Sequence, residues 1–136
     1  MPGSTLVTDS IGGNETVLIV EDSPSLRELF HHSLKASGYR VLEAGTGEEA
    51  LQVVDTHAGP IHMLVTDVIM PGMGGRELAA RFKEKRPESR VLYVSGYPDE
   101  TIARRGVLES GVTLLLKPFG PVEFIRKVRE QLDRAY

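Results

Sequence analysis

The sequence contains no cysteine, so it can form no disulfide bond and offers no thiolate for catalysis or metal binding. No apolar run approaches the roughly 20 residues that a membrane-spanning helix needs. No apolar segment of a signal peptide follows Met1. Long blocks of like charge are also missing, and a formal net charge of −3 is not typical of a nucleic-acid-binding protein. We therefore expect a cytoplasmic protein without direct contacts to membrane or nucleic acid.

The length of 136 residues suits one domain with a single sizeable core. Residues 1–14 are rich in Gly, Ser and Thr and have no sustained hydrophobic periodicity. We interpret them as a flexible tail or linker remnant. Residues 15–136 are expected to form the folded domain.

From Glu15 onward, short β-branched runs alternate with segments of helical periodicity. Ser23 is the expected N-cap of the first helix, with Pro24 at its first position and Gly38 at its end. The predicted strands are residues 16–20, 40–44, 61–67, 90–95 and 112–116, and the predicted helices are 24–37, 46–57, 75–86, 98–110 and 121–136. Regular alternation favours an α/β fold with a parallel sheet and helices on both faces. The weaker apolar pattern of 40–44 suits an edge strand.

Polar residues stand at the carboxyl ends of four predicted strands. Glu21 and Asp22 follow the first strand, Asp67 ends the third, Ser95 ends the fourth, and Lys117 follows the fifth. Ligands of doubly wound sheets bind beyond the carboxyl ends of the strands, so these side chains are expected to converge. Each has a purely structural alternative, as a helix start, a turn former, a loop residue or a solvated strand end. Those alternatives do not explain why four elements deliver compatible chemistry to one edge.

The converging groups point to phosphoryl chemistry. Clustered carboxylates repel one another unless a cation joins them, and an oxygen-only ligand set suits Mg²⁺. A carboxylate can act as a nucleophile and form an aspartyl phosphate. Lys117 and Ser95 supply a positive charge and a hydroxyl donor for phosphoryl oxygens. The set is typical of a site that accepts a phosphoryl group.

Four segments resemble the receiver domains of two-component response regulators: "LIVEDS", "LVTDVIMPGMGG", "YVSGY" and "LLLKPF", in the expected order and at strand ends. The resemblance runs from about Thr16 to Leu132. It implies a flavodoxin-like, doubly wound five-stranded parallel sheet of order 2-1-3-4-5. It also implies a signalling switch or phosphorelay element that takes a phosphoryl group from a phosphohistidine.

The resemblance assigns roles residue by residue. Asp67 is the implied phospho-acceptor, and Glu21, Asp22, Asp67 and the backbone carbonyl of Ile69 are the implied ligands of Mg²⁺ or Mn²⁺. Ser95 and Lys117 are implied to bind the phosphoryl group, and the bond before Pro118 is implied to be cis. The implied partner is the dimerisation domain of a histidine kinase or a histidine phosphotransfer protein, and we expect a monomer or weak dimer.

One position departs from the common pattern of the family. Many receivers carry Tyr or Phe three residues before the lysine, where this chain has Leu114. Tyr97, two residues after Ser95, could shield the site or report its state instead. The segments "SGYPDE" and "LLLKPFGPVEFIRKVREQL" look most like receivers of hybrid sensor kinases, whose parent proteins can be tethered to a membrane. A stand-alone response regulator is the alternative.

Two other functions fit the same architecture less well. Mg²⁺-dependent phosphohydrolases with an Asp nucleophile commonly carry a second Asp two residues later, and that position is Ile69 here. A flavin-binding module would have to place a flavin phosphate beside an acidic edge. His31 and His32 are adjacent on a predicted helix and point in different directions, His57 and His62 lie elsewhere, and all four are interpreted as surface residues. The segment "GMGG" lacks the Lys-Ser/Thr of a P-loop. We therefore expect a phospho-accepting domain with only slow autodephosphorylation.

Overall fold

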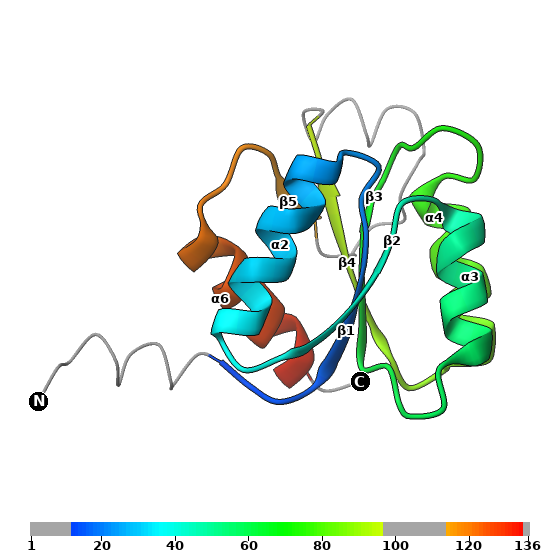
Figure 1. Cartoon of the computed structure of the whole chain (residues 1–136), viewed down its shortest axis with the longest axis horizontal. Coiled ribbons are helices and arrows are strands. Elements are labelled where there is room, and N and C mark those ends of the chain that lie inside the picture. Colours follow the sequence, from blue (N-terminus) through cyan, green and yellow to red (C-terminus); the bar gives the residue numbers. More distant parts are fainter. Residues whose placement is uncertain (1–11, 97–113, 135–136) are drawn as a thin grey trace, which may run out of the picture.

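The computed structural model describes residues 12–96 and 114–134 (Figure 1). Its elements are β1 (Thr16–Val20), α2 (Pro24–Ala36), β2 (Arg40–Ala44), α3 (Gly47–Thr56), β3 (Met63–Asp67), α4 (Gly75–Lys85), β4 (Arg90–Ser95), β5 (Leu114–Leu116) and α6 (Pro121–Asp133). Each corresponds to a predicted element, with bounds that differ by at most a few residues. The helix predicted at 98–110 and Tyr97 lie outside the described residues.

The five strands form one parallel sheet in the order β2-β1-β3-β4-β5, as predicted. The register aligns the carboxyl ends of the three inner strands, with Val20 opposite Thr66 and Asp67 opposite Val94. Ser95 is opposite Leu116 at the end of β5. The residues that follow or end these strands therefore share one edge of the sheet.

Helices cover both faces of the sheet, with α2 and α6 on one side and α3 and α4 on the other (Figure 1). Successive residues of β1 point to opposite faces: Leu18 and Val20 belong to the core beneath α3 and α4, and Val17 and Ile19 to the core beneath α2 and α6. All five residues of β1 and of β3 are buried, so both faces of these two strands are covered. This double burial holds the ends of β1 and β3 in place.

The helix starts follow the expected capping chemistry. The Ser23 side chain accepts a hydrogen bond from the backbone N–H of Leu26, and Pro24 occupies the first turn of α2. The Thr46 side chain caps α3 in the same way through the N–H of Glu49. The cap at Ser23 fixes the point where the chain leaves β1 and enters α2.

Arg129 of α6 fastens that helix to the chain before β1. Its guanidinium donates to Glu15 Oε2 at 2.8 Å, to the carbonyl of Gly12 at 3.3 Å and to Asp133. The hydrogen bond to Arg129 lowers the pKa of Glu15, and the carboxylates of Glu15 and Asp133 raise the pKa of Arg129. The backbone N–H of Gly13 also donates to Ser37, so residues 12–14 of the predicted tail contact the fold.

No helix within residues 12–96 and 114–134 combines the length and apolar character required to cross a bilayer.

Candidate functional site

The loop after β1 presents two adjacent carboxylates in different environments. Glu21 is 1% exposed, and its Oε2 accepts a hydrogen bond from the backbone N–H of Ser23 at 3.0 Å. Its Oε1 lies 3.0 Å from Lys117 Nζ. Asp22 is exposed, one residue further along. The loop therefore holds one carboxylate in the protein and directs the next toward solvent.

Asp67 ends β3 and is only 4% exposed. Its Oδ1 lies 2.8 Å from Lys117 Nζ, whereas its buried Oδ2 has no hydrogen-bond partner among the described residues. Burial raises the pKa of Asp67 to about 7, against the opposing effect of Lys117, and the neighbouring Glu21 adds to the rise. The charged form of Asp67 is thus incompletely compensated by the protein alone.

Lys117 follows β5 and bridges the two buried carboxylates. Burial by itself would lower the pKa of the lysine, but its hydrogen bonds to Asp67 and Glu21 outweigh that effect and raise it. Lys117 therefore stays protonated and offsets part of the negative charge. The peptide bond between Lys117 and Pro118 is cis, the form that the resemblance implies.

A cavity of about 210 Å³ opens at this edge of the sheet. The residues that line it come from the ends of several elements: Asp22, Asp67, Ile69, Val94, Ser95, Gly96 and Lys117. Ser95 ends β4 and is 3% exposed, while Ile69 is 38% exposed in the loop after β3. Five predicted site residues therefore line the cavity. A sixth, Glu21, does not line it but accepts a hydrogen bond from Lys117.

Two glycines shape the loop between β3 and α4. Gly72 has a φ of +76°, a backbone conformation that glycine adopts at little cost. A Cβ atom on Gly75 would lie 2.0 Å from the Asp67 carbonyl oxygen, so only glycine allows α4 to start here. The N–H of Gly75 donates to the carbonyl of Val68 at 2.8 Å. The loop is therefore packed directly on the backbone that carries Asp67.

A comparison with known protein families matches residues 17–129 to the response regulator receiver domain. The chain belongs to this family. It is a receiver domain of two-component signalling, as the four sequence motifs predicted.

Curated relatives agree with this assignment. The chain is 33% identical over 124 residues to a sensor kinase, CckA, of Brucella abortus, covering 91% of this chain and 13% of that protein. It is 36% identical over 111 residues to a cyclic di-GMP phosphodiesterase of Thermotoga maritima, covering 82% of this chain and 29% of that protein. The chain thus spans only a small part of these relatives.

Solved structures show the same fold. The receiver domain of the hybrid histidine kinase CckA is 37% identical, with a TM-score of 0.73, and the match covers 87% of this chain and 99% of that one. The chemotaxis protein CheY4 of Vibrio cholerae is 29% identical, with a TM-score of 0.71, covering 88% and 99%. These likenesses support the predicted sheet and its order.

Receiver domains generally bind Mg²⁺ in an acidic pocket, and the residues of this chain fit such an ion. Carboxylate oxygens of Glu21, Asp22 and Asp67 all lie within 4.8 Å of one another. Hard oxygen ligands are those that Mg²⁺ prefers, and Asp67 Oδ2 is a buried acceptor in need of a partner. Within the described ranges this is the one group of three or more potential ligands, and no histidine belongs to it.

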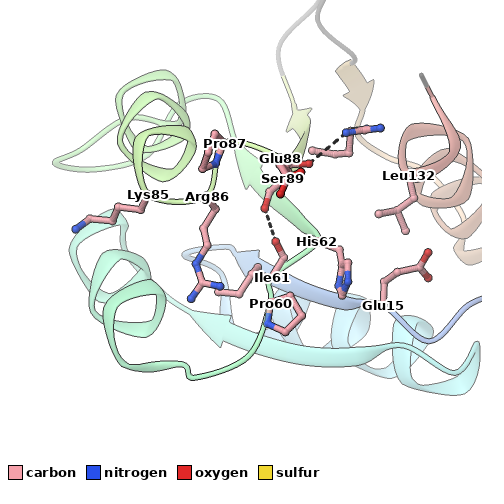
Figure 2. A pocket seen from close by; sticks show the side chains of 11 residues that line it. Glu15, Pro60, Ile61, His62, Lys85, Arg86, Pro87, Glu88, Ser89 and Leu132 are labelled. Atoms are coloured by element: carbon pink, nitrogen blue, oxygen red, sulfur yellow. Dashed lines mark hydrogen bonds between the residues drawn. The ribbon is translucent and has the colours of Figure 1, made fainter. Parts of the chain in front are cut away.

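A second cavity, of about 570 Å³, lies at the opposite end of the sheet, before β1, β3 and β4 (Figure 2). Its main polar side chains form hydrogen bonds to the backbone of neighbouring loops. Arg86 donates to the carbonyls of Val54, His57 and Gly59 at the end of α3, and the Ser89 hydroxyl donates to the carbonyl of Ile61. The Nδ1 of His62 accepts the N–H of Thr16 at 2.9 Å. These contacts tie loops together and do not converge on a ligand.

Arg27 is a residue of the site that sequence reasoning did not single out. It lies on α2 and donates a hydrogen bond from Nη1 to the backbone carbonyl of Glu21 at 2.7 Å. A single arginine on an amphipathic helix is usually a solvent-exposed residue. Only the position of Arg27, one turn after the N-cap Ser23, indicates a contact with the preceding loop. The hydrogen bond from Arg27 to the Glu21 carbonyl is a tertiary contact that the sequence alone does not reveal.

Proposed function

We propose that Asp67 accepts a phosphoryl group from a phosphohistidine in a Mg²⁺-dependent reaction. The observation that carries this proposal is the buried Asp67 Oδ2, which has no partner among the described residues although Asp67 lines an open cavity. A carboxylate oxygen so placed keeps a lone pair for a reacting phosphorus atom. The same edge of the sheet carries a lysine and a hydroxyl group suited to phosphoryl oxygens.

The transfer step forms one bond and breaks one. An oxygen of the ionised Asp67 carboxylate attacks phosphorus, the bond between phosphorus and the donor imidazole nitrogen breaks, and the imidazole keeps the electron pair and is protonated by solvent. Mn²⁺ or Mg²⁺, held by Glu21, Asp22, Asp67 and the backbone carbonyl of Ile69, would offset charge on the phosphoryl oxygens. Asp67 is only 4% exposed, which would limit the access of water to the acyl phosphate.

Lys117 and Ser95 complete the acceptor site. Lys117 Nζ is already 2.8 Å from Asp67 Oδ1, so a phosphoryl group on Asp67 lies within its reach. The Ser95 hydroxyl lines the same cavity and would donate to another phosphoryl oxygen. Both groups bind negative charge without acting as general acid or base, which is consistent with slow rather than rapid hydrolysis.

In this proposal, phosphorylation shifts an equilibrium between two conformations of the domain. Movement of Ser95 toward the phosphoryl group would repack the loop after β4, shifting a pre-existing equilibrium. Leu114, which takes the place of the common aromatic residue, packs against the core beneath α3 and α4. The aromatic form of the switch is therefore unavailable at this position, so Tyr97 or a simple relay of the phosphoryl group takes its place in the proposal.

The context of the domain is also part of the proposal. We place residues 15–136 as the receiver unit, with residues 1–14 as a tail or linker, in a hybrid sensor kinase. The partners would be the dimerisation domain of a histidine kinase or a histidine phosphotransfer protein, in the cytoplasm. The likeness to the receiver domain of the hybrid histidine kinase CckA supports this placement over a stand-alone regulator.

A labelling experiment with two variants tests the assignment. Incubation with a phosphohistidine donor and Mg²⁺ should give one acid-labile phosphoryl group on the wild-type chain, seen by intact-mass spectrometry. Asp67→Asn should fold and remain unlabelled, whereas Asp55→Asn, which changes an exposed carboxylate on α3, should label normally. Persistent labelling of Asp67→Asn would overturn the assignment, and repeated release of phosphate from a phosphomonoester would favour a phosphohydrolase instead.

A further inference from the structure

Arg27 holds the peptide group that joins the two acidic residues of the β1–α2 loop. Its Nη1 donates to the carbonyl oxygen of Glu21 at 2.7 Å, and that oxygen belongs to the peptide between Glu21 and Asp22. Nothing in the phosphoryl chemistry described above uses this contact. It connects a charged side chain of α2 to the backbone of two residues of the proposed metal site.

The peptide group on the other side of Asp22 is also held. The backbone N–H of Ser23 donates to Glu21 Oε2 at 3.0 Å. Asp22 itself is exposed, so packing of its side chain cannot fix its direction. The backbone therefore sets the direction in which the Asp22 side chain leaves the chain, and both flanking peptide groups are held by hydrogen bonds, one of them from Arg27.

Arg27 is in turn fixed from the neighbouring strand. Its Nε lies 3.5 Å from Glu43 Oε1 on β2, and Glu43 also pairs with His31 of α2. Its backbone N–H donates to the carbonyl of the N-cap Ser23 at 2.9 Å. The guanidinium is thus held on two sides and is not an exposed side chain that happens to reach the loop.

We propose that Arg27 is a positioning residue for the divalent cation: it locks the Glu21–Asp22 peptide so that the Asp22 carboxylate meets those of Glu21 and Asp67. The proposal rests on the metal site of the proposed function. Such an outer contact keeps ligand atoms in place before the ion arrives, and its loss weakens metal affinity without removing a ligand.

The positive charge of Arg27 and its proposed positioning role affect Mg²⁺ affinity in opposite directions. The Arg27 guanidinium donates to the backbone of the loop that carries Glu21 and Asp22, and its positive charge repels a cation bound there, so removal of the charge alone would tighten Mg²⁺ binding. Loss of positioning would weaken it. The two effects have opposite signs, and Arg27→Gln therefore decides between them.

The experiment measures the Mg²⁺ dissociation constant by isothermal titration calorimetry for wild type, Arg27→Gln, Arg27→Lys and Glu43→Gln. We expect Arg27→Gln to bind about tenfold more weakly than wild type. Arg27→Lys, which keeps the charge and one donor, should fall between them. Glu43→Gln keeps the contact to Glu21 and should change the constant less than Arg27→Gln does.

Each outcome bears on the proposal. Equal or tighter binding by Arg27→Gln overturns it, and so does a Glu43→Gln effect as large as that of Arg27→Gln, because Arg27 would then act only through its ion pair. Backbone NMR spectra check the fold of each variant, and if Arg27→Gln unfolds, wild-type affinity in Arg27→Lys overturns the proposal. Wild-type binding with unchanged variants refutes this inference alone, whereas no binding by wild type refutes the metal site and this inference with it.

Discussion

Gly75 lies so close to Asp67 that a Cβ atom on the glycine would stand 2.0 Å from the Asp67 carbonyl oxygen and 3.0 Å from its carbonyl carbon. The first residue of α4 is therefore packed on the backbone of the proposed acceptor. A backbone atom cannot rotate away as a flexible side chain can. The contact couples the start of a helix to the position of the reactive carboxylate.

Gly75→Ala should consequently destabilise the domain by at least about 2 kcal/mol, because either α4 or the end of β3 must shift. Urea unfolding monitored by circular dichroism measures the loss. Gly74→Ala is the matched control: its added Cβ would lie 3.6 Å from the nearest carbonyl oxygen, and the φ of Gly74 is −76°. Similar losses in both variants would contradict the argument.

Asp67→Asn should stabilise the metal-free protein. Burial raises the pKa of Asp67 to about 7, which means that its ionised form opposes folding at about pH 8. A neutral amide of the same shape removes that cost, and we expect a gain of about 1 kcal/mol in the free energy of unfolding. Addition of Mg²⁺ should raise the melting temperature of wild type more than that of the variant. A less stable Asp67→Asn would show that the carboxylate is better compensated than its contacts indicate.

Lys117→Met should destabilise the metal-free protein by about 3 kcal/mol, because it leaves Glu21 and Asp67 as unpaired buried carboxylates. Mg²⁺ should restore more stability to this variant than it adds to wild type, since the ion replaces the missing charge. Thermal unfolding with and without Mg²⁺ measures both effects. Lys127→Met, which removes a more exposed lysine on α6, is the control and should respond to Mg²⁺ as wild type does.

The pair of Glu15 and Arg129 predicts a pH dependence far from the acidic site. The hydrogen bond to Arg129 lowers the pKa of Glu15 below its usual 4.5, so the stabilising effect of the pair is complete above that value. It is lost as the pH falls through the lowered pKa of the folded state. The difference in stability between wild type and Glu15→Gln should therefore be about 1 kcal/mol near neutral pH and should vanish in acid.

Urea unfolding over a range of pH values tests this dependence. Glu28→Gln, a change of an exposed residue on α2, is the control and should show little difference at any pH. A difference for Glu15→Gln that persists in strong acid would assign the effect to packing and not to the ion pair.

The sheet and its helices were largely predictable from the sequence. Double burial of β1 and β3 produces continuous apolar runs, and Ser23-Pro24 is a helix start that local chemistry determines. The strand order came from the family resemblance, because alternation of strands and helices alone allows several orders. The segment around Tyr97 was also assigned from pattern, and it lies outside the described residues.

The candidate site was predictable in its members but not in its contacts. Residues at strand ends converge because parallel strands share an edge, which places Asp67, Ser95 and Lys117 together. No sequence pattern shows that Lys117 bridges Glu21 and Asp67. Nor does any pattern show that Asp67 Oδ2 has no hydrogen-bond partner among the described residues, or that Arg27 donates to the Glu21 carbonyl. Those are tertiary contacts between residues far apart in the chain or on the surface of a helix, where periodicity carries no information about partners.

The attachment of Gly12 to Arg129 has a consequence for how such a domain can be combined with others. Arg90, at the start of β4, donates to the carbonyl of Arg134, so the described chain enters and leaves at the amino end of the sheet (Figure 1). Asp67 lies at the other end. Neighbouring domains joined at these two points would leave the acidic edge unobstructed. The acidic edge around Asp67 would then stay accessible whichever domains are joined at the two ends of the described chain.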